Sequence, residues 1–337
     1  MKLTYEQIKS AAWGAARTEN INGYIQLLRF TKEQEDLYKT VKEDFYNKTF
    51  ATAGVRLAFK TNSRKLSLKA VFEQASSRTY FALDVKVNGK LIGSLNNCGG
   101  EVFFETEREN YKLGEYSKTF ELPGGENEIM IYFPWSCKVK LQSVELDDGA
   151  SFEPVKREKQ VLMLGDSITQ GYCAVHPSCR YSSMVADEIG AEERNKAIGG
   201  EIFRPELAVL RDEDYEPDYI TVAYGTNDWS CRTRERMVEQ CRDFYVGLSK
   251  TYPNAKIFAI APIWRADRDK KTEYGSFDLV FDDIENAVKD LPNVEFISAY
   301  SFVPENPEFF ADLYLHPNDA GFEYYCKGLA KKIKSLI

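Results

Sequence analysis

The sequence predicts an α/β fold in which a parallel sheet with flanking helices follows an all-β domain of the jelly-roll or β-sandwich kind. Two observations predict this. Between residues 49 and 146, short segments alternate apolar and polar residues and are separated by turn-forming residues, as antiparallel strands are. After residue 158, apolar strands alternate with helical segments, which indicates βαβ units. We expect residues 1–153 to form the β-sandwich domain, with a short helical segment, and residues 158–337 the second domain.

The first domain begins with mixed segments and continues with strands only. Residues 3–16 predict a short helix, 22–30 a strand, and 31–46 a charged, helix-forming segment. Asn88-Gly89, between two apolar runs, is a strong signal for a two-residue hairpin turn. The expected strands cover residues 55–63, 65–73, 80–95, 101–107, 116–124, 127–135 and 138–148.

The charged segment at residues 155–159 marks the linker to the second domain. Five apolar segments alternate with helix-forming ones, and the regular alternation predicts a single parallel sheet. The expected strands cover residues 161–164, 194–198, 219–224, 256–262 and 294–298, and the expected helices residues 180–190, 204–211, 231–251, 277–290 and 318–335.

Composition excludes several classes of function. The formal net charge of −8 argues against a nucleic-acid partner, which usually requires a basic face. The sequence shows no apolar run of the ~20 residues that span a membrane and no leader peptide, so we expect a cytoplasmic protein without membrane association. The seven cysteines are odd in number and form no C-x-x-C pair, so the sequence suggests neither disulfides nor a metal site.

Short segments of glycine and polar residues follow the first three strands of the second domain, and another precedes its last helix. Gly-Asp-Ser at 165–167 ends the first strand, and Asn-Lys-Ala-Ile-Gly-Gly at 195–200 follows the second. Gly-Thr-Asn-Asp at 225–228 follows the third, and His316-Pro317 precedes the last helix. Because parallel strands end at the same rim of a sheet, where α/β proteins bind ligands, we expect these segments to meet.

The order of these four segments resembles the SGNH (GDSL-type) hydrolase superfamily over roughly residues 160–335. The resemblance implies a flavodoxin-like domain with a serine nucleophile, a histidine base and no cofactor. Carried over residue by residue, it implies that Ser167 is the nucleophile and His316 the base. It also implies that an oxyanion hole forms from the backbone N–H groups of Ser167 and Gly200 and the side-chain amide of Asn227; Gly199, directly before Gly200, is the less favoured choice.

The residue that orients the base is left open between two alternatives. The superfamily usually carries Asp three residues before His, where this chain has Leu313, and Asp312 lies one residue further back. Either the loop holds an extra residue and Asp312 still reaches Nδ1 of His316, which we favour, or a backbone carbonyl orients a Ser–His dyad. The chain has one other histidine, His176, which we expect to shape a loop or line the substrate rim rather than act as base.

Trp229 and Trp264 each follow a strand end. Tryptophan at such a junction usually packs in the core, but two of them flanking one cleft would also suit the walls of a small acyl or sugar pocket. We therefore name Trp229, Trp264 and His176 as candidate substrate-binding residues.

A β-rich domain before an SGNH domain resembles two-domain carbohydrate acetyl esterases of the CE2-like group. The resemblance implies removal of O-acetyl groups from xylan- or mannan-type oligosaccharides through an acetyl-enzyme. The β-rich domain would bind glycan, lend aromatic residues to the cleft or support a homo-oligomer. The alternatives are a GDSL lipase or lysophospholipase acting on lipids or thioesters, and a glycan-binding protein without activity.

Overall fold

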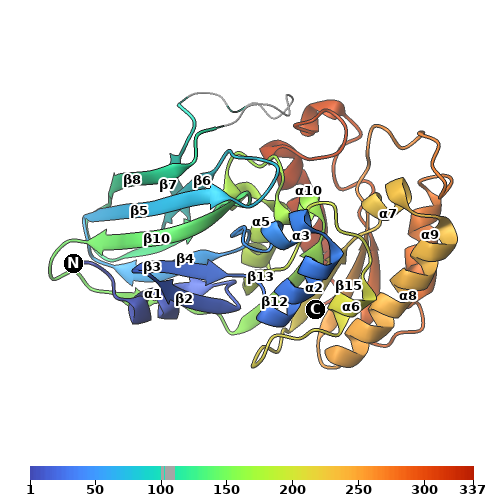
Figure 1. The fold of residues 1–337 in the computed structure, drawn as a ribbon, viewed down its shortest axis with the longest axis horizontal. Coiled ribbons are helices and arrows are strands. Elements are labelled where there is room, and N and C mark those ends of the chain that lie inside the picture. Colours follow the sequence, from blue (N-terminus) through green and yellow to red (C-terminus); the bar gives the residue numbers. More distant parts are fainter. Residues whose placement is uncertain (100–101, 103–110) are drawn as a thin grey trace.

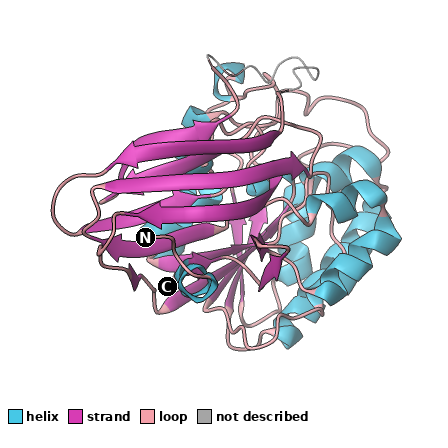
Figure 2. Cartoon of the chain, turned by 60° about the vertical axis from the view of Figure 1, so that its left-hand side comes forward, coloured by secondary structure: helices cyan, strands magenta, loops and turns pink. Residues whose placement is uncertain are grey.

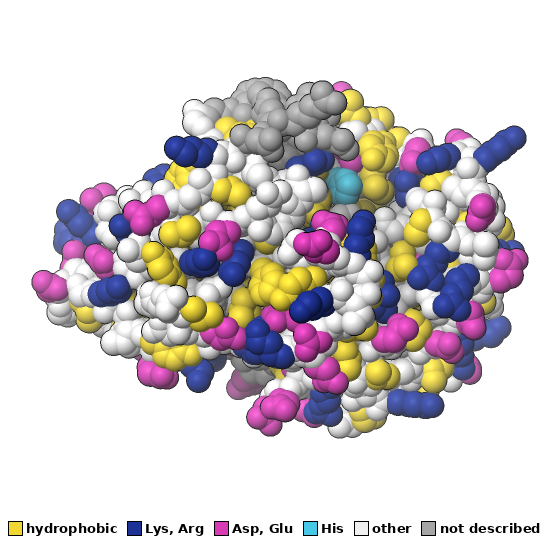
Figure 3. All heavy atoms as spheres, in the orientation of Figure 1, with side chains coloured by type: hydrophobic (Ala, Val, Ile, Leu, Met, Phe, Trp, Pro, Cys, Tyr) yellow, Lys and Arg dark blue, Asp and Glu magenta, His cyan; other side chains and the backbone are white. Residues whose placement is uncertain are grey.

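The computed structural model describes residues 1–99, 102 and 111–337. In Figure 1 the strands of the N-terminal part, which we call the β region (residues 1–153), lie at one end of the molecule. The helices of the C-terminal part, the α/β region (residues 158–337), lie at the other end, and Figure 2 shows the same segregation from a second direction. On the face shown in Figure 3, acidic and basic side chains are interspersed over both regions.

Two antiparallel sheets make up most of the β region. In the first the strand order is β1-β4-β9-β6-β7, with β11 paired to β4, and in the second it is β2-β3-β10-β5-β8. The first sheet consists of β1 (Ala12–Trp13), β4 (Arg56–Thr61), β6 (Ala82–Val87), β7 (Lys90–Asn96), β9 (Asn127–Tyr132) and β11 (Glu153–Pro154). The second consists of β2 (Arg17–Ile21), β3 (Tyr24–Leu28), β5 (Lys65–Gln74), β8 (Gly114–Glu121) and β10 (Cys137–Leu146).

The two sheets share one apolar core, because alternate residues of their strands point to the same side. Phe59 and Ile131 come from the first sheet and Phe72 and Val139 from the second, and all four belong to one buried cluster. The predicted turn forms as expected, since Asn88 and Gly89 have φ angles of 49° and 80° between β6 and β7. The expected strand at 101–107 lies outside the described residues, apart from Val102.

The N-terminal segment contains two strands more than the sequence suggested, β1 and β2. The expected strand at 22–30 is the second arm of a hairpin whose first arm, β2, is polar and half exposed, so alternation did not reveal it. Asn22 and Gly23 form its turn, with φ angles of 52° and 81°. The expected helix at 3–16 is limited to α1 (Tyr5–Ala11), which begins at a capping box of Thr4 and Gln7.

The helix-forming segment of the β region packs against the other region. It folds as α2 (Lys32–Val41) and α3 (Glu43–Lys48). Phe30 and Tyr38 are buried in the same cluster as Phe244 of the α/β region. The β region therefore contributes side chains to the core of the α/β region.

The α/β region holds five parallel strands in the order β13-β12-β14-β15-β16. Numbered along the chain this is the order 2-1-3-4-5 of flavodoxin-like sheets, with its switch point beside the first strand. The strands are β12 (Lys159–Gly165), β13 (Ala191–Asn195), β14 (Tyr219–Ala223), β15 (Lys256–Ala261) and β16 (Val294–Ser298).

Helices cover both faces of this sheet. Val161 and Met163 of β12 face one buried cluster and Leu162 and Leu164 face another, as alternation along a strand requires. The helices are α4 (Ser167–Gln170), α5 (Tyr181–Glu188), α6 (Pro205–Ala208), α7 (Thr226–Cys231), α8 (Arg234–Thr251), α9 (Leu279–Val288) and α10 (Asp319–Lys334), with 3₁₀ turns at Pro177–Cys179 and Pro307–Phe309. In the described part of the chain, none of the helices has the length and apolar character needed to cross a membrane.

Strand β13 lies three residues earlier than the predicted 194–198. Its sequence, Ala-Glu-Glu-Arg-Asn, carries charges that the apolar pattern could not assign to a strand. Glu193 is nevertheless buried, because Arg56 and Arg180 both approach its carboxylate. Burial alone would raise the pKa of Glu193, but the two guanidinium groups outweigh it and lower the pKa to about 2. The carboxylate therefore stays charged inside the protein.

Candidate active site

Ser167 stands where the first strand of the parallel sheet gives way to helix α4. Asp166 caps this helix and accepts a hydrogen bond from the N–H of Ile168 at 2.9 Å. Ser167 is thus the first helical residue, and its own N–H has no partner within the helix. The position lies at the switch point of the sheet, between the ends of β13, β12 and β14.

The structure brings Ser167, His316 and Asp312 together. Nε2 of His316 lies 2.8 Å from Oγ of Ser167, and Nδ1 of His316 lies 2.6 Å from Oδ2 of Asp312. Burial would raise the pKa of Asp312, but the bond to His316, the charge of the ring and the backbone N–H groups of Leu315 and His316 lower the pKa to about 2. An ionised carboxylate can only accept, so Nδ1 carries the proton and Nε2 is left to accept from the serine hydroxyl.

The spacing of the acid and the base has a local explanation. The segment from Asp312 to His316 curls around the carboxylate, so that Oδ1 of Asp312 accepts from the N–H groups of Tyr314, Leu315 and His316 at 3.1, 2.8 and 3.0 Å. Leu313 has a left-handed φ of 65°, an unusual conformation for leucine. The extra residue thus belongs to the turn that carries Asp312 to the histidine ring.

The segment after β13 lies beside this group. The N–H of Gly199 donates to Oε1 of Gln170 at 2.7 Å, so it is already bonded to the protein. Gly200 is exposed and has a φ of 89°, a conformation that favours glycine. Among the residues that the structure describes, no hydrogen-bond acceptor is found for the N–H of Gly200.

Asn227 comes from the first turn of α7, directly after β14. Its Nδ2 donates to the backbone carbonyl of Glu201 at 2.9 Å. An amide nitrogen carries two hydrogens, so this bond fixes the plane of the amide and leaves the second hydrogen available to a ligand. The bond also links α7 to the segment that carries Gly200.

The three candidate substrate-binding residues lie in different surroundings. Trp229 is 0% exposed, and its Nε1 donates to the carbonyl of Gly275 at 2.9 Å, so it packs in the core and offers substrate no surface. Trp264 is also buried, against Phe310 at 5.4 Å between ring centroids. Both positions fit packing in the core, which is usual for a tryptophan at a strand–helix junction, better than they fit the predicted wall of a substrate pocket.

His176 is bonded to the β region, whereas His316 is the histidine bonded to Ser167. Nδ1 of His176 lies 3.0 Å from Oδ1 of Asp84 on β6, and this bond raises the pKa of His176 more than partial burial lowers it. The backbone N–H groups of Val175 and His176 donate to Asp319 at the start of α10. These bonds fit the loop-shaping role proposed from the sequence.

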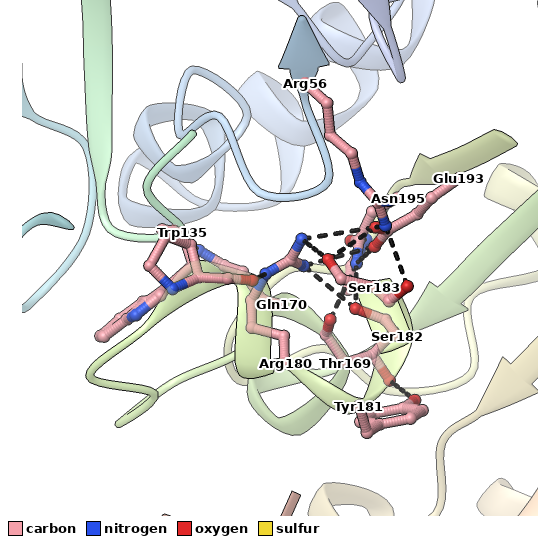
Figure 4. Close-up of polar contacts among 12 residues, drawn as sticks. Arg56, Trp135, Thr169, Gln170, Arg180, Tyr181, Ser182, Ser183, Glu193 and Asn195 are labelled. Atoms are coloured by element: carbon pink, nitrogen blue, oxygen red, sulfur yellow. Dashed lines mark hydrogen bonds and ion pairs between the residues drawn. The ribbon is translucent and has the colours of Figure 1, made fainter. Parts of the chain in front are cut away.

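A buried polar network supports the segment that carries Ser167 (Figure 4). The hydroxyl groups of Thr169 and Tyr181 lie 2.6 Å apart, and Nδ2 of Asn195 donates to the carbonyl of Thr169 at 2.8 Å. Nε2 of Gln170 donates to the carbonyl of Trp135 in the β region at 2.9 Å. Sequence reasoning missed these supports, since Gln170 gave no signal beyond its place in the Gly-Asp-Ser-Ile-Thr-Gln run.

The described residues contain no cluster of three or more histidine, cysteine or acidic side chains suited to a metal ion. The groups brought together at the sheet edge are a hydroxyl, an imidazole, a carboxylate and nearby N–H donors. This combination suits nucleophilic attack on an acyl group, in which the base takes the hydroxyl proton and the donors stabilise the oxyanion.

Comparisons with known proteins agree with the chemistry of these groups. Residues 163–324 match the model of the GDSL-like lipase/acylhydrolase family. A comparison with curated proteins finds no match. A salicylyl-acyltransferase, SsfX3, from a tetracycline biosynthetic pathway has a similar structure, with a TM-score of 0.77 and 18% identity over 96% of this chain and 94% of that one.

Two further solved structures resemble the whole chain. A putative GDSL-like lipase from Bacteroides ovatus has a TM-score of 0.76 and 19% identity over 99% of this chain and 97% of that one. A family two carbohydrate esterase from Cellvibrio japonicus has a TM-score of 0.64 and 16% identity over 99% and 97%. At these identities the likeness concerns the fold, and the family rests on the matched residues. Residues 163–324, slightly less than half of the chain, therefore resemble the GDSL-like lipase/acylhydrolase family.

Proposed function

We propose that the protein is a serine esterase that removes O-acetyl groups from carbohydrates through an acetyl-enzyme. The observation that carries the proposal is the placement of His316 between Ser167 and Asp312, at 2.8 and 2.6 Å. These are hydrogen-bond distances between nucleophile and base and between base and orienting acid.

In the proposed reaction, Oγ of Ser167 attacks the acetyl carbonyl while Nε2 of His316 takes its proton. The negative oxygen of the tetrahedral intermediate accepts from the N–H groups of Ser167 and Gly200 and from Nδ2 of Asn227. The imidazolium then protonates the departing sugar oxygen, so that the sugar leaves with a free hydroxyl and the acetyl group stays on Ser167. Water, deprotonated by His316, attacks this ester, and collapse of the second intermediate releases acetate and restores the serine.

The choice of a carbohydrate ester is supported by the full-length likeness to a family two carbohydrate esterase, which extends over the β region as well as the α/β region. A direct test is acetate release from acetylated xylan and mannan oligosaccharides, measured with the wild-type protein and with Ser167→Ala. We expect release by the wild-type protein alone. No release by the wild-type protein from any acetylated glycan would contradict the carbohydrate assignment.

The same assay separates the alternative acyl substrates. A series of p-nitrophenyl esters from acetate to octanoate should show a preference for acetate, whereas a preference for octanoate would support a lipase. The likeness to an acyltransferase makes a second acceptor worth testing. We expect added alcohols to leave acetate as the main product, and a new ester as main product would identify a transferase.

A further inference from the structure

The peptide group that joins Gly199 to Gly200 accepts a hydrogen bond from a residue of the β region. Nζ of Lys48, at the end of helix α3, donates to the carbonyl of Gly199 at 2.9 Å. Both residues are buried, and Lys48 reaches Gly199 across 151 positions of the chain. A charged donor makes one of the stronger hydrogen bonds available to a carbonyl, so this contact fixes where the carbonyl points.

The direction of that carbonyl decides the direction of the neighbouring N–H. The C=O of Gly199 and the N–H of Gly200 belong to one planar peptide group, and the described chain contains no cis peptide bond. In a trans peptide the two point in opposite directions. With its C=O held toward Lys48, the group must point its N–H away from Lys48, and no acceptor among the described residues receives it.

Lys48 itself is held firmly. Oδ2 of Asp44 lies 2.6 Å from its Nζ, and the ring of Phe45 lies 5.4 Å away. The buried guanidinium of Arg29 donates to the carbonyls of Lys48, Asn195 and Ala197 at 3.0, 3.0 and 3.1 Å. Arg29 therefore ties the end of α3 to the segment that leads to Gly199, which keeps the ammonium group in register with that peptide.

We propose that Lys48 is a positioning residue for the oxyanion hole. Its ammonium group orients the Gly199–Gly200 peptide and draws electron density from the carbonyl, which makes the N–H of Gly200 a stronger donor. Its positive charge also lies behind the oxygen that becomes negative in the tetrahedral intermediate. The inference rests on the proposed role of Gly200 as an oxyanion donor, and it gives the β region a part in the chemistry of the α/β region.

The test compares Lys48→Met with Lys48→Arg and with a matched control, Lys42→Met. Lys42 is exposed and lies 6.0 Å from the same Phe45 ring, and no hydrogen bond links its side chain to Gly199. With p-nitrophenyl acetate we expect Lys48→Met to lower kcat about tenfold with little change in KM, which is less than the loss of a whole oxyanion donor. Lys48→Arg should recover most of the rate, and Lys42→Met should match the wild type.

A second measurement does not depend on the natural substrate. A fluorophosphonate labels the active serine, and its phosphoryl oxygen occupies the oxyanion hole as the covalent bond forms. The rate of labelling of Ser167 should fall in Lys48→Met by a factor similar to that in kcat. If the wild-type protein is labelled but releases no acetate from glycans, the carbohydrate proposal fails while the role of Lys48 is still measured.

Two results would overturn the inference. One is a folded Lys48→Met protein whose kcat and labelling rate stay within about twofold of wild type, far from the cost of a weakened oxyanion donor. The other is an equal loss in Lys42→Met, which would indicate a general effect of charge. If Lys48→Met does not fold, Lys48→Gln replaces it, since it keeps a donor and loses the charge, and we expect a loss of about threefold in kcat.

Discussion

The two loops that flank Ser167 are built in opposite ways. The base loop, residues 312–316, supports itself, because Asp312 accepts three backbone N–H groups from its own turn and binds the ring of His316 four residues on. The oxyanion loop, residues 195–201, depends on distant partners. Lys48, Gln170 and Asn227 each bond to its backbone from a different element.

The source of a loop's support determines whether its function can be recognised from the sequence. A self-supporting loop keeps its chemistry within a few residues, so Asp-Leu-Tyr-Leu-His could be recognised as a candidate from the sequence. The oxyanion loop is held by distant residues, so the sequence of the loop itself reveals only Gly199 and Gly200. Its supports carry no local pattern, because a lysine at the end of a charged helix is ordinarily a solvated residue.

The largest expected effect concerns the contact between the base loop and the nucleophile. We expect Ser167→Ala and His316→Ala each to lower kcat on p-nitrophenyl acetate by about 10⁴–10⁶-fold, because either change removes the proton-transfer pair. His176→Ala is the matched control and should stay near the wild-type rate. A near-native His316→Ala protein together with an inactive His176→Ala protein would transfer the role of base to His176.

The second-largest effect is expected when the base loop loses its carboxylate. Asp312→Asn keeps an oxygen for the three backbone N–H groups and removes the charge that faces Nδ1 of His316. We expect a loss of about 10³–10⁴-fold in kcat, because the neutral amide no longer holds the ring in the required tautomer. Thermal unfolding at pH 7 should occur at a lower temperature than in the wild type, because the lowered pKa of Asp312 means that its charge stabilises the folded state. A loss of less than about tenfold would favour a Ser–His dyad oriented by other groups.

A smaller effect is expected on the oxyanion side. Asn227→Ala removes a side-chain donor and the bond to the carbonyl of Glu201, and we expect kcat to fall about 10²–10³-fold with KM little changed. Asn286→Ala, on the exposed face of α9, is the control and should leave both constants unchanged. An Asn227→Ala protein in which only KM rises would place the amide in substrate binding instead.

The smallest effect is one of stability, and it concerns Asp228, whose carboxylate accepts from the N–H of Phe203 just beyond the oxyanion loop. Burial raises the pKa of Asp228 to about 7, against the lowering effect of Arg232 and of backbone bonds. Between the unfolded pKa of about 3.9 and this value, the folded state holds a proton that the unfolded state has lost, so stability falls as the pH rises from about 4 to about 7.

Asp228→Asn removes this pH dependence and keeps an acceptor for Phe203. We expect the variant to be more stable than wild type at pH 8, on the order of 1–3 kcal/mol, with a smaller difference at pH 4. Thermal or denaturant unfolding at both values measures it. A gain of the same size at pH 4 and pH 8 would show that the carboxylate is not the source.

Most of the fold could be predicted from periodicity. The expected strands at 219–224, 256–262 and 294–298 and the final helix at 318–335 agree with β14, β15, β16 and α10 within a few residues. The pattern failed where charges are buried in pairs. Glu193 of strand β13 pairs with Arg56 and Arg180, and Arg56 lies far from it in the sequence.

The candidate site, like the fold, could be predicted only where its residues lie in local motifs. The structure brings Ser167, His316 and Asp312 into contact, and the motifs that named them were local. Trp229 and Trp264 were chosen by their position after strands, but a strand end reaches both the rim and the core, and only packing decides between them. Lys48 and Arg29 lie in a segment that the sequence assigned to the β-sandwich, so no motif could connect them to Gly199.

The tie between helix α3 and the oxyanion loop sets a condition for engineering this enzyme by domain exchange. A truncated protein that starts at residue 158 would strip Arg29 and Lys48 from the loop and uncover the core surface on which Phe30 and Tyr38 pack. A productive chimera must therefore inherit residues 29–48 together with the α/β region. The part of the chain that activity requires therefore begins well before β12, the strand that leads to Ser167.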